Sequence, residues 1–131
     1  MKSIVAKSAA VIQMAATLSA HAQKFDDKGI ARTETVRRDV DGRSEAIQVR
    51  VDFAHNAAFP KHSHPGIEIA YVLSGTVEYA MDGKTIRLQA GESLYIPAGA
   101  VHSARNVGTG VSAELATYLV EKNQPIVILD K

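Results

Sequence analysis

The sequence contains no cysteine, and this absence removes several kinds of chemistry. The chain cannot form a disulfide framework, a thiolate metal site or a cysteine nucleophile. Any metal ion must therefore bind to nitrogen and oxygen donors. A chain without cysteine is also compatible with an oxidising compartment such as a periplasm.

The chain also lacks a surplus of either charge. It has 15 Lys and Arg against 14 Asp and Glu, a formal net charge of +1. The two signs are scattered, with no basic stripe of the kind that follows nucleic-acid phosphates, so we expect no nucleic-acid partner. A length of 131 residues suits a single domain with one core.

No apolar run is long enough for a permanent membrane span, but the N-terminus has the three regions of a secretory signal. Two lysines within the first seven residues precede an apolar, alanine-rich stretch that ends at Leu18. Ala20 and Ala22 then place small residues at both recognition positions of a signal peptidase.

We therefore predict that residues 1–22 are a signal peptide that is cleaved before Gln23. Residues 23–131 would then form a secreted, periplasmic domain. The alternative is that the apolar stretch is an ordinary N-terminal helix of the folded domain.

After the predicted signal, no stretch keeps a helical period for three turns, whereas alternation with a period of two recurs. The turn residues Asp41-Gly42 and Asp82-Gly83 each separate two alternating segments, which predicts two hairpins. The predicted strands cover residues 32–38, 46–53, 68–73, 76–81, 84–88, 93–96, 101–106 and 113–121. The apolar tail 126–129 could pair with a sheet edge or a second subunit. About eight to ten short strands predict an all-β, single-domain jelly-roll barrel.

His62 and His64 are two residues apart, so on an extended strand both imidazoles face the same side. Pro65-Gly66 can then turn the chain and bring the Glu68 carboxylate toward them. A histidine pair of this kind is by itself weak evidence, because two exposed histidines before a turn give the same pattern.

The residues around this pair form two longer motifs. The first is His62-x-His64-x3-Glu68-x6-Gly75, and the second is Gly91-x5-Pro97-x-Gly99-x2-His102-x3-Asn106. In this order they resemble the two signatures of the cupin superfamily, and specifically a small single-domain cupin. One position departs from the pattern: Asn56 replaces the glycine that usually lies six residues before the first histidine. Asn tolerates left-handed backbone angles, so we expect the turn to survive.

The resemblance implies a cupin-like double-stranded β-helix with four metal ligands, His62, His64, Glu68 and His102. Three imidazoles and one carboxylate suit one divalent transition metal ion, with Fe, Mn, Ni, Cu and Zn all open. An octahedral ion would keep two positions for other ligands. The resemblance also makes a homodimer an expectation, with apolar residues in 113–121 and 126–129 available for the contact.

Two functions remain open. The resemblance implies a metal-dependent enzyme for a small organic molecule, of the dioxygenase, decarboxylase, isomerase or lyase type. The alternative is a non-catalytic module that binds a metal or a small molecule. A general base is hard to identify, because the motif segments offer only Glu78 and Glu92 as further carboxylates.

The remaining polar and aromatic residues near the motifs carry weaker expectations. We expect Arg105 to point away from His102, and His55 to lie in an exposed loop. One of Tyr71, Tyr79, Tyr95 and Tyr118 could line the pocket.

Overall fold

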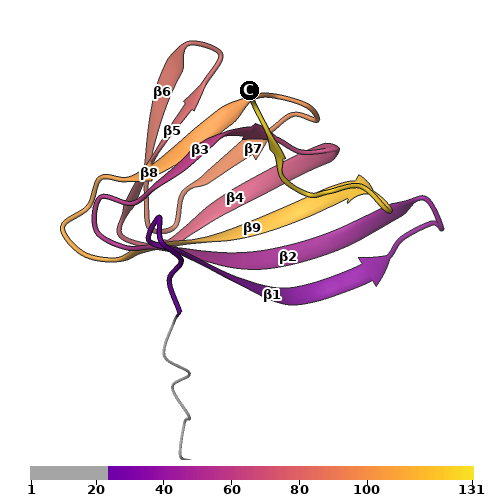
Figure 1. Ribbon diagram of the computed structural model, residues 1–131, viewed down its shortest axis with the longest axis horizontal. Helices are drawn as coiled ribbons and strands as arrows, with labels where there is room; N and C mark the ends of the chain where they lie inside the picture. The colour runs from indigo at the N-terminus through magenta and orange to yellow at the C-terminus, as the bar shows by residue number, and fades with distance from the viewer. Residues whose placement is uncertain (1–23) are drawn as a thin grey trace, which may run out of the picture.

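The computed structural model describes residues 24–131, which form ten β-strands and no helix (Figure 1). The predicted signal peptide lies outside the described residues. Within residues 24–131 there is no helix long and apolar enough to cross a membrane. The strands are β1 (Ile30–Asp39), β2 (Ser44–Phe53), β3 (Ala58–Ser63), β4 (Gly66–Ser74), β5 (Thr76–Met81), β6 (Lys84–Gln89), β7 (Ser93–Ile96), β8 (His102–Asn106), β9 (Ser112–Glu121) and β10 (Ile128–Leu129).

The strands form two antiparallel five-stranded sheets, as predicted for a jelly roll. The first sheet has the order β1-β2-β9-β4-β7 and the second has the order β10-β3-β8-β5-β6. Strands that follow one another in the sequence often belong to different sheets. For example, β3 lies between β10 and β8 in the second sheet, and β4 lies between β9 and β7 in the first. This topology brings the two motifs, which are far apart in the sequence, to the same part of the fold.

Both predicted hairpins are confirmed. β1 pairs with β2 around Asp41-Gly42, and β5 pairs with β6 around Asp82-Gly83. Asp82 and Gly83 have φ angles of 53° and 68°, the left-handed conformation of a two-residue hairpin turn. Asn56 has a φ of 62°, so it adopts the left-handed angles expected at this departure from the motif.

The core lies between the two sheets and follows from the alternation in the sequence. Ile47, Val49, Val51 and Phe53 of β2 are at most 4% exposed, while the residues between them mostly face outward. Burying a side chain of this size contributes about 1.5–3 kcal/mol, so these positions favour one register of the sheet.

Two local features place the site at the end of β3. A Cβ on Gly66 would overlap the backbone of Leu119 in β9, so only glycine lets β4 approach β9 closely here. On the other side, β10 pairs with β3 and opposes Leu129 to His62. The apolar tail therefore pairs with a sheet edge of its own chain, one of the two outcomes that the sequence left open.

Candidate metal centre

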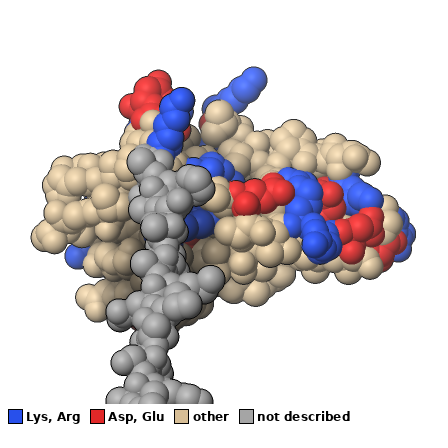
Figure 2. Space-filling model, turned by 90° about the horizontal axis from the view of Figure 1, so that it is seen from below, with Lys and Arg blue, Asp and Glu red and all other residues tan. Residues whose placement is uncertain are grey.

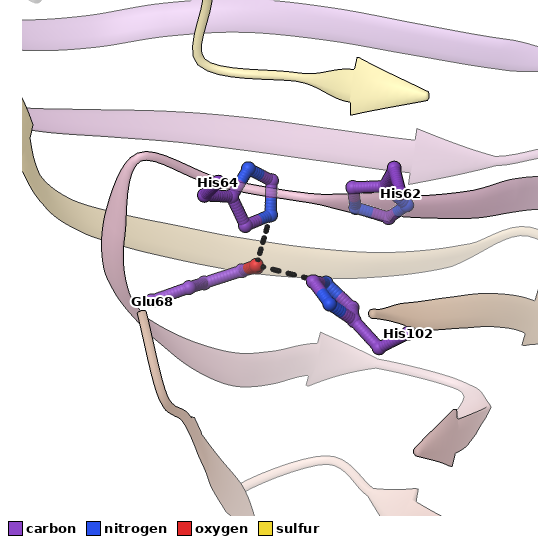
Figure 3. A group of neighbouring side chains, drawn as sticks. All are labelled: His62, His64, Glu68 and His102. Atoms are coloured by element: carbon purple, nitrogen blue, oxygen red, sulfur yellow. Dashed lines mark ion pairs between the residues drawn. The ribbon is translucent and has the colours of Figure 1, made fainter. Parts of the chain in front are cut away.

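Three strand ends bring the two motifs together (Figure 3). His62 is near the end of β3 and lies directly opposite His102 of β8. His64 follows β3 in the turn, and Glu68 comes from β4, after the turn has reversed the chain direction. All four predicted ligands are buried, with side chains between 2% and 5% exposed.

The polar atoms of these four residues converge on one point. Oε2 of Glu68 lies 2.7 Å from Nε2 of His64 and 3.3 Å from Nε2 of His102 (Figure 3). One ligand atom from each of the four residues lies within 4.8 Å of the others. Two ligands on opposite sides of an ion are about 4.2 Å apart when each bond is about 2.1 Å. Small side-chain movements would therefore close this group around an ion.

Hydrogen bonds to the backbone set the tautomer of each histidine. Nδ1 of His62, His64 and His102 lies 2.7, 2.5 and 2.9 Å from the carbonyl oxygens of Pro60, Ile126 and Ala100 respectively. A carbonyl oxygen only accepts, so each Nδ1 carries the hydrogen and each Nε2 keeps its lone pair. The three Nε2 atoms are therefore available as ligands, in the arrangement typical of metal-binding histidines.

Two of the converging atoms have no hydrogen-bond partner. Among residues 24–131, Nε2 of His64 and Oε2 of Glu68 are buried and unpaired, although only 2.7 Å separates them. Both atoms are acceptors in this tautomer, so their contact brings two electron pairs together. Buried polar groups are rarely left unpaired, because this costs about 1–3 kcal/mol. A bound cation removes this cost, so the residues present fit a divalent metal ion.

The ionisation of His62 and Glu68 also suits a cation, whereas His102 must give up a proton to bind one. Burial lowers the pKa of His62 to about 4, which keeps this imidazole neutral. Burial raises the pKa of Glu68, but a proton on Nε2 of His102 or His64 lowers it by more, to about 2, because that N–H then donates to the carboxylate. For His102, burial lowers the pKa, while the Glu68 carboxylate and the Ala100 carbonyl raise it above its usual value.

A small cavity adjoins the four residues. It is lined by His62, Glu68 and His102 and also by Arg32, Tyr79, Glu114 and Tyr118, with apolar side chains completing the wall. The centre of a water molecule has about 10 Å³ available, the room that one water requires. Tyr79 and Tyr118 are thus the tyrosines that face the pocket, whereas Tyr71 and Tyr95 are 41% and 57% exposed.

Sequence reasoning missed the most unusual residue in this cavity. Glu114 of β9 is 5% exposed and accepts a hydrogen bond from the hydroxyl of Tyr79. Burial raises the pKa of Glu114 to about 8, and the negative charge of Glu68 adds to this effect. Burial also raises the pKa of Tyr79, so at neutral pH both groups hold their protons. Glu114 alternates along β9 with Ala116, Tyr118 and Val120 and so shares their inward face. An acidic residue in this alternating apolar series was the signal that could have identified it.

The carboxylates proposed from the motif segments lie elsewhere. Glu78 forms ion pairs with Arg87 and Arg105, at 2.8 and 3.0 Å, on the outside of the second sheet. Glu92 accepts a hydrogen bond from the backbone of Gln89. Arg105 points away from His102, as expected, and His55 is exposed.

Asn106, the last residue of the second motif, has a structural role. Its side chain is 1% exposed and joins the end of β2 to the segment 108–112. Nδ2 donates to the carbonyl oxygens of Phe53, Ala54 and Gly110, and Oδ1 accepts from the Gly108 backbone and the Ser112 hydroxyl. This network fixes the loop before β9, the strand that carries Glu114.

The fold and the buried group together define a small jelly-roll protein with a three-histidine, one-glutamate cluster able to hold a metal ion. The sequence model of the cupin domain matches residues 49–120. The chain therefore belongs to the cupin family. A comparison with curated protein sequences returns no match.

Solved structures agree with this assignment. A cupin superfamily protein from Desulfitobacterium hafniense DCB-2 is 18% identical, with a TM-score of 0.62 over 74% of this chain and 83% of that one. An oxalate oxidase in complex with glycolate is 28% identical, with a TM-score of 0.63 over 79% of this chain and 56% of that one. The DMSP lyase DddQ from Ruegeria pomeroyi DSS-3 is 25% identical, with a TM-score of 0.57 over 64% of this chain and 42% of that one.

Proposed function

We propose that this protein is a metal-dependent enzyme that acts on a small organic molecule. One divalent transition metal ion would be held by His62, His64, Glu68 and His102. When bound, it would supply Lewis-acid or redox chemistry at positions that the four ligands leave free. The similarity to an oxalate oxidase and to a DMSP lyase supports this class of function and leaves the reaction itself open.

The observation that carries the proposal is the position of Glu114. Its carboxyl group lines the same cavity as His62, Glu68 and His102, and it forms no ion pair with any residue in 24–131. An unpaired buried carboxyl group is costly for stability and is typical of a site that moves protons.

Glu114 is arranged to exchange a proton with a molecule in the cavity. The hydroxyl of Tyr79 donates to Oε2, and no hydrogen bond within residues 24–131 engages Oε1. Burial raises the pKa of Glu114 toward the neutral range, in which a carboxyl group can act both as an acid and as a base. The hydrogen bond from Tyr79 holds the carboxyl group in one orientation.

The test uses protein loaded separately with Fe, Mn, Ni, Cu and Zn and a panel of small organic acids, enols and phenols. Product formation is followed by mass spectrometry, and oxygen uptake is followed for Fe and Cu. Glu114→Gln should keep the metal content of the parent and lose turnover by about 100-fold or more. Glu78→Gln, on the outer face of the barrel, is the matched control and should retain activity. Equal turnover by Glu114→Gln and the parent would contradict the acid–base role.

One observation favours the alternative, a non-catalytic binding module. The four candidate ligands are at most 5% exposed and the adjoining cavity has room for about one water molecule, as in a closed site. This alternative predicts stoichiometric metal, or a tightly retained small ligand, with no turnover for any metal in the panel.

The proposal extends to export and assembly. We propose that the chain is exported and cleaved before Gln23, which N-terminal sequencing of protein from a periplasmic fraction would test. We also propose a homodimer. Apolar side chains on the outer face of β4, β7 and β9 support it, since Ile69, Tyr95 and Leu119 are 43%, 57% and 44% exposed. Light scattering combined with size-exclusion chromatography would give the mass in solution.

A further inference from the structure

Arg32 of β1 belongs to the inner side of the first sheet. It pairs directly with Val51 of β2, whose side chain is buried in the core, and opposed residues in antiparallel strands face the same way. Arg32 therefore extends toward the interior and lines the cavity that contains Glu114 and the candidate metal ligands. Every other residue lining this cavity is buried or partly buried, whereas Arg32 is exposed. The guanidinium group thus lies at the mouth of the cavity.

This guanidinium group acts on the pKa of Glu114 and Tyr118 from a distance, but it forms no ion pair with a carboxylate. Four other arginines have a carboxylate oxygen within 3.0 Å, and Arg32 has no ion-pair partner among residues 24–131. These four are Arg37, Arg50, Arg87 and Arg105. The guanidinium carbon of Arg32 lies 5.7 Å from the centroid of the Phe59 ring, a cation–π distance that limits its orientation.

Arg32 is not part of a general basic surface. Figure 2, seen from the side of β1, shows basic and acidic side chains interspersed. Near the tip of the β1–β2 hairpin, Arg37 pairs with Glu34 and Glu45, and Lys122 pairs with Asp39. These pairs neutralise one another, and Arg32 is the one Arg or Lys side chain that lines the cavity.

We propose that Arg32 binds a carboxylate group of the substrate at the mouth of the cavity, so that the substrate is a small organic acid. A guanidinium group binds a carboxylate through two parallel hydrogen bonds, which fixes the position and the orientation of the acid. The room inside the cavity admits about one water molecule, so the acid binds at the mouth and directs one polar group inward. This inference rests on the proposed function.

The charges of the site favour a carboxylate over a phosphate. Glu68 and Glu114 already bring two carboxyl groups to the wall, and Arg32 is the one Arg or Lys side chain among the residues that line the cavity. A dianionic phosphate would bring more negative charge toward Glu68 than one arginine neutralises. A carboxylate monoanion matches the single positive charge and the planar geometry of the guanidinium group.

The test is isothermal titration calorimetry of the full chain with glycolate, with the protein metal-free and loaded with Zn²⁺. Glycolate is a monoanion that offers its one carboxylate to Arg32 and a small hydroxyl group to the interior. The neutral amide glycolamide and inorganic phosphate serve as comparison ligands. We expect Arg32→Gln to weaken glycolate binding by about 10-fold or more, from the loss of two charge-assisted hydrogen bonds. Arg32→Lys should lose part of the affinity, because it keeps the charge without the paired donors.

Arg38→Gln is the matched control, since Arg38 lies on the same strand, is exposed and forms no ion pair within residues 24–131. It should bind glycolate as the parent does, and glycolamide should not bind. Equal glycolate affinity for Arg32→Gln and the parent, or phosphate binding as tight as glycolate binding, would overturn the inference.

Metal content measured on each sample distinguishes a failure of this inference from a failure of the proposed function. If the Zn²⁺-loaded protein binds glycolate independently of Arg32, this inference fails and the metal site stands. If the parent takes up no metal, the proposed function fails. The effect of Arg32→Gln on glycolate binding to the metal-free protein then decides the inference.

Discussion

Nδ1 of His64 lies 2.5 Å from the carbonyl oxygen of Ile126, a residue 62 positions later in the chain. This contact joins the C-terminal tail to the candidate metal centre. The tail is held beside the site by the pairing of β10 with β3. Because the hydrogen bond fixes the tautomer and orientation of a candidate ligand, the tail belongs to the site.

Removal of the tail should therefore weaken metal binding. A chain that ends at Gln124 loses the Ile126 carbonyl, and we expect its affinity for Zn²⁺ to fall by about 10- to 100-fold. A chain that ends at Leu129 keeps this carbonyl and should bind Zn²⁺ as the parent does. Competition with a chelator measures both affinities, and equal affinity in the two truncated chains would refute the role of the tail.

Metal affinity should fall as the pH decreases, because protons compete for the imidazoles. The pKa of His102 is raised above the ordinary value of 6.5, so the loss should begin above pH 6.5. Glu68, with a pKa of about 2, stays ionised throughout this range. Dissociation constants for Zn²⁺ at pH 8, 7, 6 and 5 test this prediction. A constant affinity down to pH 5 would be inconsistent with imidazole ligands.

Glu114 should make the metal-free protein less stable as the pH rises. The pKa of Glu114 is about 8 in the folded chain and near the ordinary 4.5 in the unfolded chain. Between these values the folded state holds a proton that the unfolded state releases, so the free energy of unfolding decreases with rising pH. Glu114→Gln removes this pH dependence. The free energy of unfolding of the variant, relative to that of the parent, should therefore increase from pH 5 to pH 8. Urea unfolding at both values provides the comparison, and a difference that did not depend on pH would contradict the raised pKa.

Asn106 should contribute to stability without contributing to metal binding directly. Asn106→Ala leaves several buried backbone groups without partners, at about 1–3 kcal/mol for each group that water cannot reach. We expect a loss of about 3 kcal/mol or more in the free energy of unfolding. Gln89→Ala, at an exposed position, should change stability by less than about 0.5 kcal/mol. A loss of similar size in both variants would argue against the network around Asn106.

Local sequence patterns predicted most of the strands and the candidate ligands. Alternating residues in β2 and the turn pair Asp82-Gly83 act over a few positions, so their effect can be seen without the fold. The grouping of His62, His64 and Glu68 depends on one turn, and the second motif supplies His102. The similarity of both motifs to cupin signatures then placed the two segments in one barrel.

The other residues of the cavity depend on the packing of distant strands. Arg32 comes from β1, Glu114 comes from β9, and the partner of His64 comes from the tail. Alternation gives two faces to a strand, but it does not say which polar residue on the inner face will be left without a partner. That property depends on which side chains the opposite sheet provides, as Tyr79 does for Glu114.

Elemental mass spectrometry of the protein, purified without chelators, tests the central claim most directly. The parent should contain close to one equivalent of Fe, Mn, Ni, Cu or Zn, or take up one equivalent on reconstitution. The double variant His62→Ala, His102→Ala should lose it, while a His55→Ala variant, altered at an exposed histidine outside the cluster, should keep it. A parent that stays metal-free after reconstitution, or a double variant that retains the full equivalent, would show that these four residues do not form a metal centre.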